Sequence, residues 1–506
     1  MDWNGNLMGP IFDEQGLEQG GSNSSDYYKI YGKEQLELAQ RSDLGLRIGN
    51  LMVASIGQAD DTILISTDIV SLFFELELTK SFCHMNMIEL SAEKTKLQLF
   101  NSSSCDTNLS NFNPLKINGN VIPYCSKADH VGIIRGVDGN GPAVLDRITA
   151  HRKALASVLF TGIAKGHRAN PVIGLRVEKI YGTPVLLSGL AALVLTKKEI
   201  DMIDHHYQET VRQLLRLHKN TPRCFLFFLA GCLPGAAMIH MRQLNLFGMI
   251  SRMDPKNLLY QHARNYLSSV VHFKNSWFYQ IRKWCLLYRL PHPSELFEQK
   301  LSKEKFKSLV KKGVLSHWET VLREEAFHLK SLVFFKPHFM SLLTPHPLWV
   351  TAGYSPIKVA MATIQALFLS GRYRCGALTR HWTPGHDSGS CVMSPLCTGI
   401  LEDIPHILRL CPALKNVRHR LYDFTLRFSS NLPADLLSLI RTKCHPDSPN
   451  FVSFVLDCSV DPDVILTSQK LGSSILAPIF AVTRTWAYVL HRERMKLLGR
   501  WTPVAY

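Results

Sequence analysis

The sequence predicts an α+β protein in which a small antiparallel sheet with its helices is followed by a mainly α-helical region. Two patterns favour this class. Short runs of β-branched and apolar residues, separated by turn residues, recur up to about residue 140, as expected of short strands. Beyond that point apolar residues recur every three to four positions over long stretches, which is the spacing of helices. The chain of 506 residues is long enough for about two to four domains.

The first strands are expected at "LMVASI" (51–56) and "TILIS" (62–66), on either side of the turn "GQADD". Apolar residues at helical spacing follow from Asp68 to Leu90, so we expect a helix that packs on this hairpin. Residues 101–114 read as a polar loop. The stretch 115–136 reads as short strands joined by an Asn-Gly turn, a strong hairpin signal.

The later elements are helices broken by Gly- and Pro-containing segments. Helical patterns cover 143–165, 199–218, 235–250, 256–290, 296–333 and 471–498. We therefore expect three regions: 1–140 with the sheet, 141–340 with basic helices, and 341–506 as a C-terminal region.

The charge balance points to a polyanionic partner. Lys and Arg outnumber Asp and Glu by 57 to 41, which gives a net charge of +16. Such an excess suits nucleic acid or an acidic membrane surface, and a merely basic soluble protein is the alternative. The first residues lack the basic end and apolar core of a signal peptide. With twelve cysteines, we expect an intracellular protein, nuclear or cytoplasmic, without a transmembrane span.

The adjacent carboxylates Asp60 and Asp61 lie at the tip of the predicted hairpin. They could hold divalent ions or form an ordinary solvated turn. Nucleotidyl transfer uses two Mg²⁺ ions about 3.5–4 Å apart, and Mg²⁺ prefers carboxylate oxygens. The pair therefore makes a magnesium site one hypothesis for this hairpin.

The neighbouring segments carry a family resemblance. In order, they are "EQGGSNSSDYYKIY" (Glu18–Tyr31), "QADD" (Gln58–Asp61), "EKTKL" (Glu93–Leu97) and "HVGIIRG" (His130–Gly136). Together they resemble the palm of a non-LTR, LINE-type retrotransposon reverse transcriptase, an RNA-directed DNA polymerase. Gln58 stands where that family usually has an aromatic residue.

The resemblance implies specific roles. Asp60 and Asp61 would ligate Mg²⁺, and Lys94 would assist proton transfer to the pyrophosphate. The residues implied to position the nucleotide and template are Gln19, Gly20 and Ser24.

The resemblance also implies a missing part. In that family another metal-ligating Asp lies on an earlier palm strand, upstream of the Gln-Gly segment. Only 18 residues precede Gln19, and neither Asp2 nor Asp13 lies in an apolar strand pattern. By the same resemblance, we expect the fingers and the usual endonuclease to be absent as well. We therefore expect a partial palm over 1–140, a thumb-like helical region after it, and no polymerase activity from this chain alone. Deoxynucleotides would bind only to a complete site.

A second metal pattern lies near the C-terminus. Cys391-x5-Cys397-x8-His406-x4-Cys411 offers three thiolates and an imidazole, a donor set that closes a tetrahedral structural zinc site. We expect Cys391 and Cys397 on a loop, and His406 and Cys411 on adjacent levels of one helix face. The cluster and its "EDxxHxLxxC" run resemble the C-terminal Cys-Cys-His-Cys motif of LINE-type proteins. We place this zinc module at about 369–415.

Nucleic-acid contacts are expected on basic residues of the thumb-like region and of the zinc module. The candidates are Lys165, Arg168, Arg176, Arg372, Arg374 and Arg380. The aromatic and basic stretch 272–289 could stack on bases, although core packing is favoured at this helical spacing. The lysine-rich stretch 300–312 could hold phosphates or face solvent. Adjacent His205 and His206 indicate a metal only weakly, because neighbouring helix residues point apart.

Three functions remain open from the sequence. The first is an incomplete reverse transcriptase. The second is a module that binds RNA or DNA without chemistry. The third is a retroelement remnant whose zinc site is structural and which has no selected role.

Overall fold

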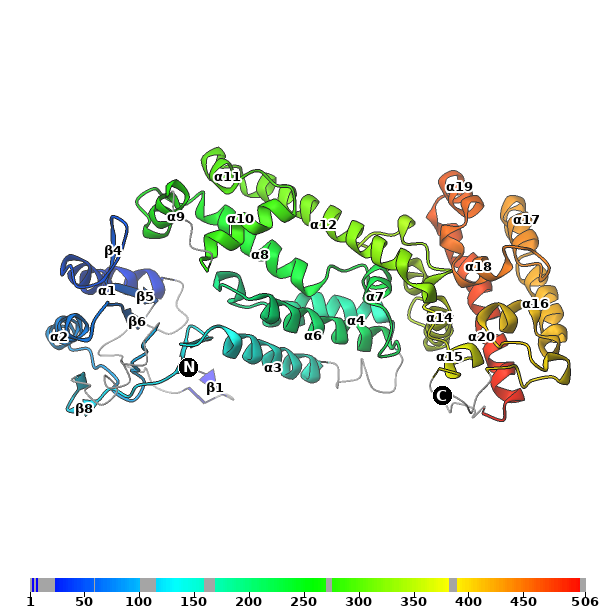
Figure 1. Ribbon diagram of the computed structural model, residues 1–506, viewed down its shortest axis with the longest axis horizontal. Coiled ribbons are helices and arrows are strands. Elements are labelled where there is room, and N and C mark those ends of the chain that lie inside the picture. The colour runs from blue at the N-terminus through cyan, green and yellow to red at the C-terminus, as the bar shows by residue number, and fades with distance from the viewer. Residues whose placement is uncertain are drawn as a thin grey trace. The chain divides into compact units, whose positions relative to one another are not determined.

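The structure is a computed structural model that describes residues 2–3, 6–7, 23–58, 60–100, 115–158, 169–269, 275–381 and 389–500 (Figure 1). Some predicted features lie outside these residues. They are the polar loop 101–114, Asp13, Gln19, Gly20, Lys165 and Arg168. Ser24 is the first residue of helix α1 (Ser24–Arg41), and its side chain lies outside the description.

The chain divides into two compact units. The first comprises Met1–Ala143 and Met249–Tyr279, and the second comprises Val144–Gly248 and Gln280–Tyr506. Every described strand belongs to the first unit, and helices make up the second. The α+β class is confirmed, whereas the identification of the first unit as a palm stays a prediction. A further boundary near residue 340 also stays a prediction.

The first unit consists of helices and small antiparallel hairpins. Its helices are α1, α2 (Ile69–Met85) and α9 (Leu258–Ser268). Its strands pair as β1 (Asp2–Trp3) with β2 (Asn6–Leu7), β3 (Leu46–Ile48) with β4 (Leu51–Val53), β5 (Ser55–Gln58) with β6 (Asp61–Leu64), β7 (Lys116–Ile117) with β8 (Asn120–Val121), and β9 (Lys127–His130) with β10 (Ile133–Gly136). Each pair is a separate two-stranded sheet within the described residues.

Helix α2 forms as the sequence predicts. Asp68 caps it, because the Asp68 carboxylate accepts hydrogen bonds from the backbone N–H of Ser71 at 2.8 Å and from its hydroxyl at 2.7 Å. Leu76 of α2 packs in an apolar cluster that draws on three other segments of the unit. The other buried members of this cluster are Leu97, Leu115, Ile117 and Ile122.

The strand predicted over 51–56 is wrong as a single element. The chain breaks at Ala54, so that β4 pairs back to β3 while β5 pairs forward to β6. The Ala54 N–H donates to the side chain of Gln40 on α1 at 3.4 Å, and its carbonyl accepts from Ile65 at 2.7 Å. Both backbone groups of Ala54 thus form hydrogen bonds outside a continuous strand ladder. A local sequence pattern cannot reveal such a break.

The first helices of the second unit surround a hydrophobic core. They are α3 (Gly141–Val158), α4 (Pro171–Val177), the π-helix η3 (Glu178–Gly182), α5 (Thr183–Leu186), η4 (Leu190–Ala192), α6 (Lys197–Leu215), α7 (Arg223–Ala230) and α8 (Gly235–Ile250). Next come α10 (Trp277–Leu287), α11 (Pro293–Gln299), α12 (Lys303–His328), η5 (Lys330–Leu332), η6 (Pro337–Phe339) and α13 (Pro347–Val350). The helix predicted over 256–290 is therefore two helices, α9 and α10.

The C-terminal helices pack around α20 (Leu476–Leu497). The others are α14 (Pro356–Leu369), α15 (Gly376–Thr379), η7 (Pro395–Cys397), η8 (His406–Leu410), η9 (Pro412–Leu414), α16 (Lys415–Phe428), α17 (Ala434–Lys443), α18 (Phe451–Leu456), η10 (Cys458–Val460), α19 (Pro462–Leu471) and η11 (Ser473–Ile475). Trp486 of α20 is fully buried, and its indole N–H donates to Thr425 at 3.0 Å. α20 also contacts α14 and α18, which makes it the central helix of this bundle.

The apolar stretches of the sequence lie mostly in the core. Phe225, Phe227 and Phe228 on α7 are fully buried. In the described part of the chain one helix, Ser473–Leu497, is long and apolar enough to cross a membrane, and half of its most apolar stretch is buried inside the protein. Helices α7 and α8 would pass the same test only together, and they are bent by 62°. A core helix has the same properties, so this is weak evidence for a span.

Candidate metal centres

The Asp60–Asp61 hairpin forms as the sequence predicts. Asp61 opposes Gln58 at the end of the β5–β6 ladder, so Asp60 belongs to the two-residue loop at the tip. Both aspartate side chains are exposed.

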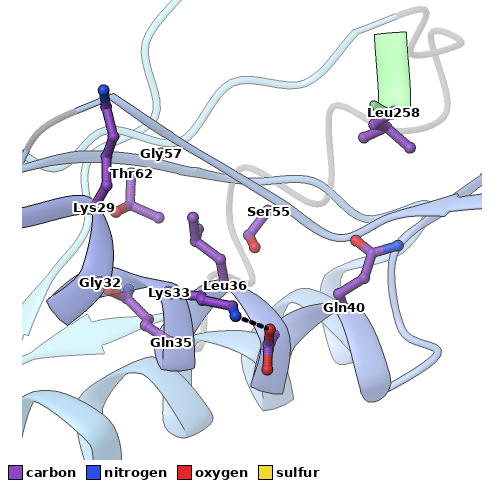
Figure 2. Close-up of a pocket in the computed structure, with 11 residues that line it drawn as sticks. Lys29, Gly32, Lys33, Gln35, Leu36, Gln40, Ser55, Gly57, Thr62 and Leu258 are labelled. Atoms are coloured by element: carbon purple, nitrogen blue, oxygen red, sulfur yellow. Dashed lines mark ion pairs between the residues drawn. The ribbon is translucent and has the colours of Figure 1, made fainter. Parts of the chain in front are cut away.

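One face of this hairpin, which carries Ser55, Gly57 and Thr62, packs toward α1. Gly57 lies against the side chain of Leu36, where an added Cβ would stand 3.2 Å from the nearest Leu36 carbon. A cavity of about 430 Å³ lies between α1 and this face of the hairpin, and Figure 2 shows the residues that line it. Its lining includes Ser55, Gly57 and Thr62 from the hairpin but neither aspartate. Because side chains alternate along a strand, Asp61 lies on the face away from α1.

The hairpin has no complete ligand set within the described part of the chain. Among the described residues, no third His, Cys, Asp or Glu joins Asp60 and Asp61 in a group with metal-binding geometry. The magnesium assignment and the roles of both aspartates therefore stay predictions.

Two other segments that carry the resemblance, 93–97 and 130–136, lie near the β5–β6 hairpin and near each other in the first unit. Lys94 is exposed in a turn, and Leu97 nearby is buried in the same apolar cluster against which Leu64 of β6 packs. The side chain of Gln98 donates to the carbonyl of Arg135 on β10 at 3.1 Å. The apolar cluster and this hydrogen bond thus bring together the parts of the chain around three of the four segments that carry the resemblance. Neither contact places Lys94 beside Asp60 and Asp61.

The turn of the β9–β10 hairpin is strained. Val131 and Gly132 form its two-residue loop with φ values of 53° and 69°. Glycine adopts this left-handed region freely, but a β-branched residue rarely does. Val131 is nonetheless half exposed at 54%, so burial does not account for a valine there.

The Cys-Cys-His-Cys cluster is assembled in the second unit. The ligand atoms of Cys391, Cys397, His406 and Cys411 all lie within 4.8 Å of one another, and all four residues are buried. The Cys411 sulfur is 3.9 Å from the sulfurs of both Cys391 and Cys397. Tetrahedral zinc with Zn–S bonds of about 2.3 Å separates its sulfurs by about 3.8 Å. The spacing fits a shared zinc ion and is far too long for a disulfide.

A π-turn brings the last two ligands together. His406 and Cys411 are five positions apart, which would place them on different sides of an α-helix. Instead, η8 is a π-helix in which the Cys411 N–H donates to the His406 carbonyl at 2.7 Å. The predicted α-helical face was therefore wrong, although the predicted proximity is confirmed. Single π-turns of this kind occur frequently at functional sites.

The chemistry of the cluster also fits zinc. The Nε2 atom of His406 is buried without a hydrogen-bond partner among the described residues. Burial raises the pKa of the thiols of Cys391, Cys397 and Cys411 and lowers the pKa of the His406 imidazole. A zinc ion held by these four residues would favour the thiolates and would give His406 Nε2 a partner. The structure therefore supports a Cys/His cluster that can bind a metal. Zinc as the bound ion stays a prediction.

Buried polar contacts hold this cluster on the bundle. Asp403 accepts a hydrogen bond from the His406 N–H at 2.7 Å and so starts the π-turn. Glu402 forms a buried ion pair with Arg494 of α20, with N–O distances of 2.9 and 2.7 Å. Glu402 also accepts from the Gly376 N–H at 2.8 Å. The sequence interpretation missed Arg494, because nothing local marks a partner 92 residues away.

The predicted phosphate contacts differ in exposure. Arg176, Arg374 and Arg380 are exposed, whereas Arg372 is partly buried. The aromatic stretch before Arg289 behaves as core, since Phe278, Trp284 and Tyr288 are at most 5% exposed. Core packing is thus confirmed for these three residues, whereas Trp277 and Tyr279 are only partly buried and residues 272–274 lie outside the description.

One basic surface was only partly found from sequence. We define the α3–η3 basic surface by Arg152, Lys153, Arg176 and Lys179, all of them exposed. Within the described ranges none of these four cations forms an ion pair with an acidic side chain. All four lie within two residues along the chain of a contact between helices, in which His151 of α3 lies 3.1 Å from Glu178 of η3. Tyr181, 46% exposed, lies on the same π-turn.

Comparisons with known proteins leave the family open. No protein-family model matches the chain, and no curated protein is similar to it.

Proposed function

We propose that this chain is part of a LINE-type reverse transcriptase and that it holds RNA or DNA through its helical unit and its zinc module. The observation that carries the binding proposal is the α3–η3 basic surface. It comprises four exposed cations without acidic partners in the described part of the chain, all within two residues of the His151–Glu178 contact, and Tyr181 on the same π-turn is exposed. Cations of this kind hold phosphates, and aromatic rings can stack on unpaired bases.

The zinc module supports the same proposal. Its metal cluster is buried, yet Val392, Leu396 and Leu410 beside the ligands are 60–78% exposed. Exposed Arg374 and Arg380 lie in the segment before the cluster. Apolar side chains next to cations suit single strands, whose bases are open to contact.

RNA binding tests the proposal. A fluorescent 20-nucleotide single-stranded RNA is titrated at several salt concentrations with wild type, with the double variant Arg152→Gln/Lys179→Gln, and with the matched control Lys197→Gln/Lys198→Gln. The control removes two exposed lysines from the start of α6. Each lost phosphate contact should reduce the salt slope by about 0.7. We expect a loss of about 1.4 in the first variant and no change in the control. Equal reductions of the salt slope in both variants would refute RNA binding at the α3–η3 basic surface.

Polymerisation is the second candidate function, and the exposed Asp60 at the tip of the β5–β6 hairpin favours it. Because no third ligand joins the pair among the described residues, we expect no incorporation of dTTP on a poly(rA)–oligo(dT) template by this chain alone. Incorporation that Asp60→Asn abolishes would establish a complete catalytic site instead.

RNA binding that survives Asp60→Asn but falls when 369–415 is removed supports the binding module. If the chain binds no RNA at physiological salt, the remaining interpretation is a retroelement remnant without a selected role.

A further inference from the structure

A buried arginine lies against the Cys-Cys-His-Cys cluster. Arg418 of α16 is 5% exposed, and its Nη2 group donates to the backbone carbonyl of Cys411 at 2.8 Å. Its Nη1 group is buried and has no hydrogen-bond partner among the described residues. Buried polar groups are nearly always paired, so an unpaired guanidinium N–H next to a metal ligand requires an explanation.

The helix that carries Arg418 does not explain it. Arg418 shares the buried face of α16 with Leu421 and Thr425, three and seven positions further on. Thr425 accepts from the indole of Trp486 on α20 at 3.0 Å, so this face points into the bundle. A cation near the start of a helix is also opposed by the helix dipole. An apolar side chain would suit this position better, and the reason for an arginine therefore lies outside α16.

No carboxylate neutralises Arg418 at close range. Within the ranges that the structure describes, it forms no ion pair, whereas the buried Arg494 is paired with Glu402. Asp447 acts on Arg418 from further away, but its side chain is 93% exposed and water screens it. A buried charge without compensation is costly. The structure therefore requires another source of negative charge near this guanidinium.

The charge of Arg418 acts on two ligands of the cluster. Burial lowers the pKa of Arg418, and the largest opposing influence is Cys411. Burial also lowers the pKa of the His406 imidazole, an effect that the carboxylates of Asp403 and Glu402 oppose and Arg418 reinforces. Arginine stays protonated in proteins in spite of such influences. Its positive charge is therefore a fixed property of the site.

The cluster becomes negatively charged when it holds zinc. Cys391, Cys397 and Cys411 then pass their three protons to the solvent, while His406 binds as a neutral imidazole. Three thiolates against a divalent ion leave one net negative charge, in a place where all four ligands are buried. Charges interact more strongly in the protein interior than in water. A fixed positive charge at this place therefore favours the zinc-loaded form over the form with three neutral thiols.

We propose that Arg418 is the counter-cation of the metal centre, which balances the negative charge of the zinc-loaded cluster and thereby tightens zinc binding. This inference rests on the zinc site of the proposed function. It gives the guanidinium a partner, since the loaded cluster supplies the negative charge that no nearby carboxylate provides. Arg418 acts through the ligands and is a positioning residue of the centre, like the outer partners that tune other metal sites.

The test measures the zinc affinity of the purified full chain at pH 7.0, by competition with a chromophoric chelator. Arg418→Gln keeps a neutral donor for the Cys411 carbonyl, and Arg418→Lys keeps the charge. The matched control, Arg420→Gln, removes an exposed charge from the same helix. We expect Arg418→Gln to bind zinc at least about tenfold more weakly than wild type, Arg418→Lys to stay within about threefold, and Arg420→Gln to be unchanged.

A second arm changes the charge of the centre instead. Cys391→His replaces one thiolate by an imidazole, so that the zinc-loaded cluster is neutral. In this background Arg418→Gln should weaken zinc binding by no more than about threefold, because no negative charge is left to balance. A purely structural arginine would cost the same in both backgrounds.

Three results would overturn the inference. One is an Arg418→Gln chain that binds zinc as tightly as wild type, and another is equal weakening by Arg418→Gln and Arg418→Lys. The third is an equal effect of Arg418→Gln with and without Cys391→His. If Arg418→Gln fails to fold, Arg418→Lys decides, since a loss of more than about tenfold there would show that charge is not sufficient. A wild-type chain that binds no zinc would overturn the zinc site itself.

Discussion

The two candidate metal sites are built in opposite ways. Asp60 and Asp61 lie exposed at a hairpin tip, and no third ligand meets them in the described residues. The cysteines and histidine of the zinc module are buried and already within coordinating distance of one another. The buried donor set leaves Nε2 of His406 without a hydrogen-bond partner among the described residues, which supports a metal-binding cluster. An exposed carboxylate pair is hydrated with or without a metal, so its geometry alone does not indicate an ion.

The largest expected effect comes from removing a ligand of the buried site. Cys411→Ser takes away the sulfur that lies 3.9 Å from both other thiols. Structural zinc contributes about 10–16 kcal/mol in small modules, and we expect most of it to be lost. Zinc content and thermal unfolding measure the loss.

The matched control is Cys375→Ser, because Cys375 is 5% exposed in the same module and outside the cluster. It should keep its zinc. Equal zinc loss in both variants would contradict the assignment of ligands.

The next largest effect is expected at the Glu402–Arg494 ion pair, which joins the zinc module to α20. Arg494→Met leaves Glu402 buried without its ion-pair partner, which costs about 3–5 kcal/mol. Urea denaturation measures the change. The double variant Arg494→Met/Glu402→Gln should recover part of the loss, because it removes the uncompensated charge. If the single variant is as stable as wild type, the pair does not hold the module on α20.

A smaller effect is expected at the strained turn of the first unit. Val131→Asn should stabilise the protein by about 1 kcal/mol, since Asn tolerates the left-handed conformation that Val131 adopts at φ 53°. Unfolding followed by a probe in the first unit measures it, with the exposed Val121→Asn on β8 as the control. A destabilised Val131→Asn variant would show that valine is not strained there.

The smallest effect is expected at the exposed metal site. Asp60→Asn should change the free energy of unfolding by no more than about 0.5 kcal/mol, because the side chain is exposed in a turn that Asn also favours. The same urea series reports it. A large destabilisation of Asp60→Asn would mean that the aspartate pair is a structural part of the first unit.

Local signals predicted the local features. The helix that follows Asp68, the Asn118–Gly119 turn with φ values of 50° and 82° and the four members of the Cys/His cluster all follow from residues close in sequence. Residue type and spacing were sufficient for these features, because the groups that interact are near neighbours along the chain.

Features that depend on distant partners were missed. The break at Ala54 needs Gln40 from α1. The pair of Glu402 and Arg494 joins the zinc module to the last helix. The adjacent histidines 205 and 206 gave no sign that the second would be buried against α3. In each case a tertiary contact decides the outcome, and one sequence carries no record of it.

The central claim is that the C-terminal cluster is a closed zinc site with three sulfur ligands and one nitrogen ligand. X-ray absorption at the zinc edge of the purified full chain tests it most directly. The account predicts about one zinc per chain, with three sulfur atoms at about 2.3 Å and one nitrogen at about 2.0 Å. Less than half an equivalent of zinc after gentle purification, or a shell of oxygen and nitrogen alone, would contradict it.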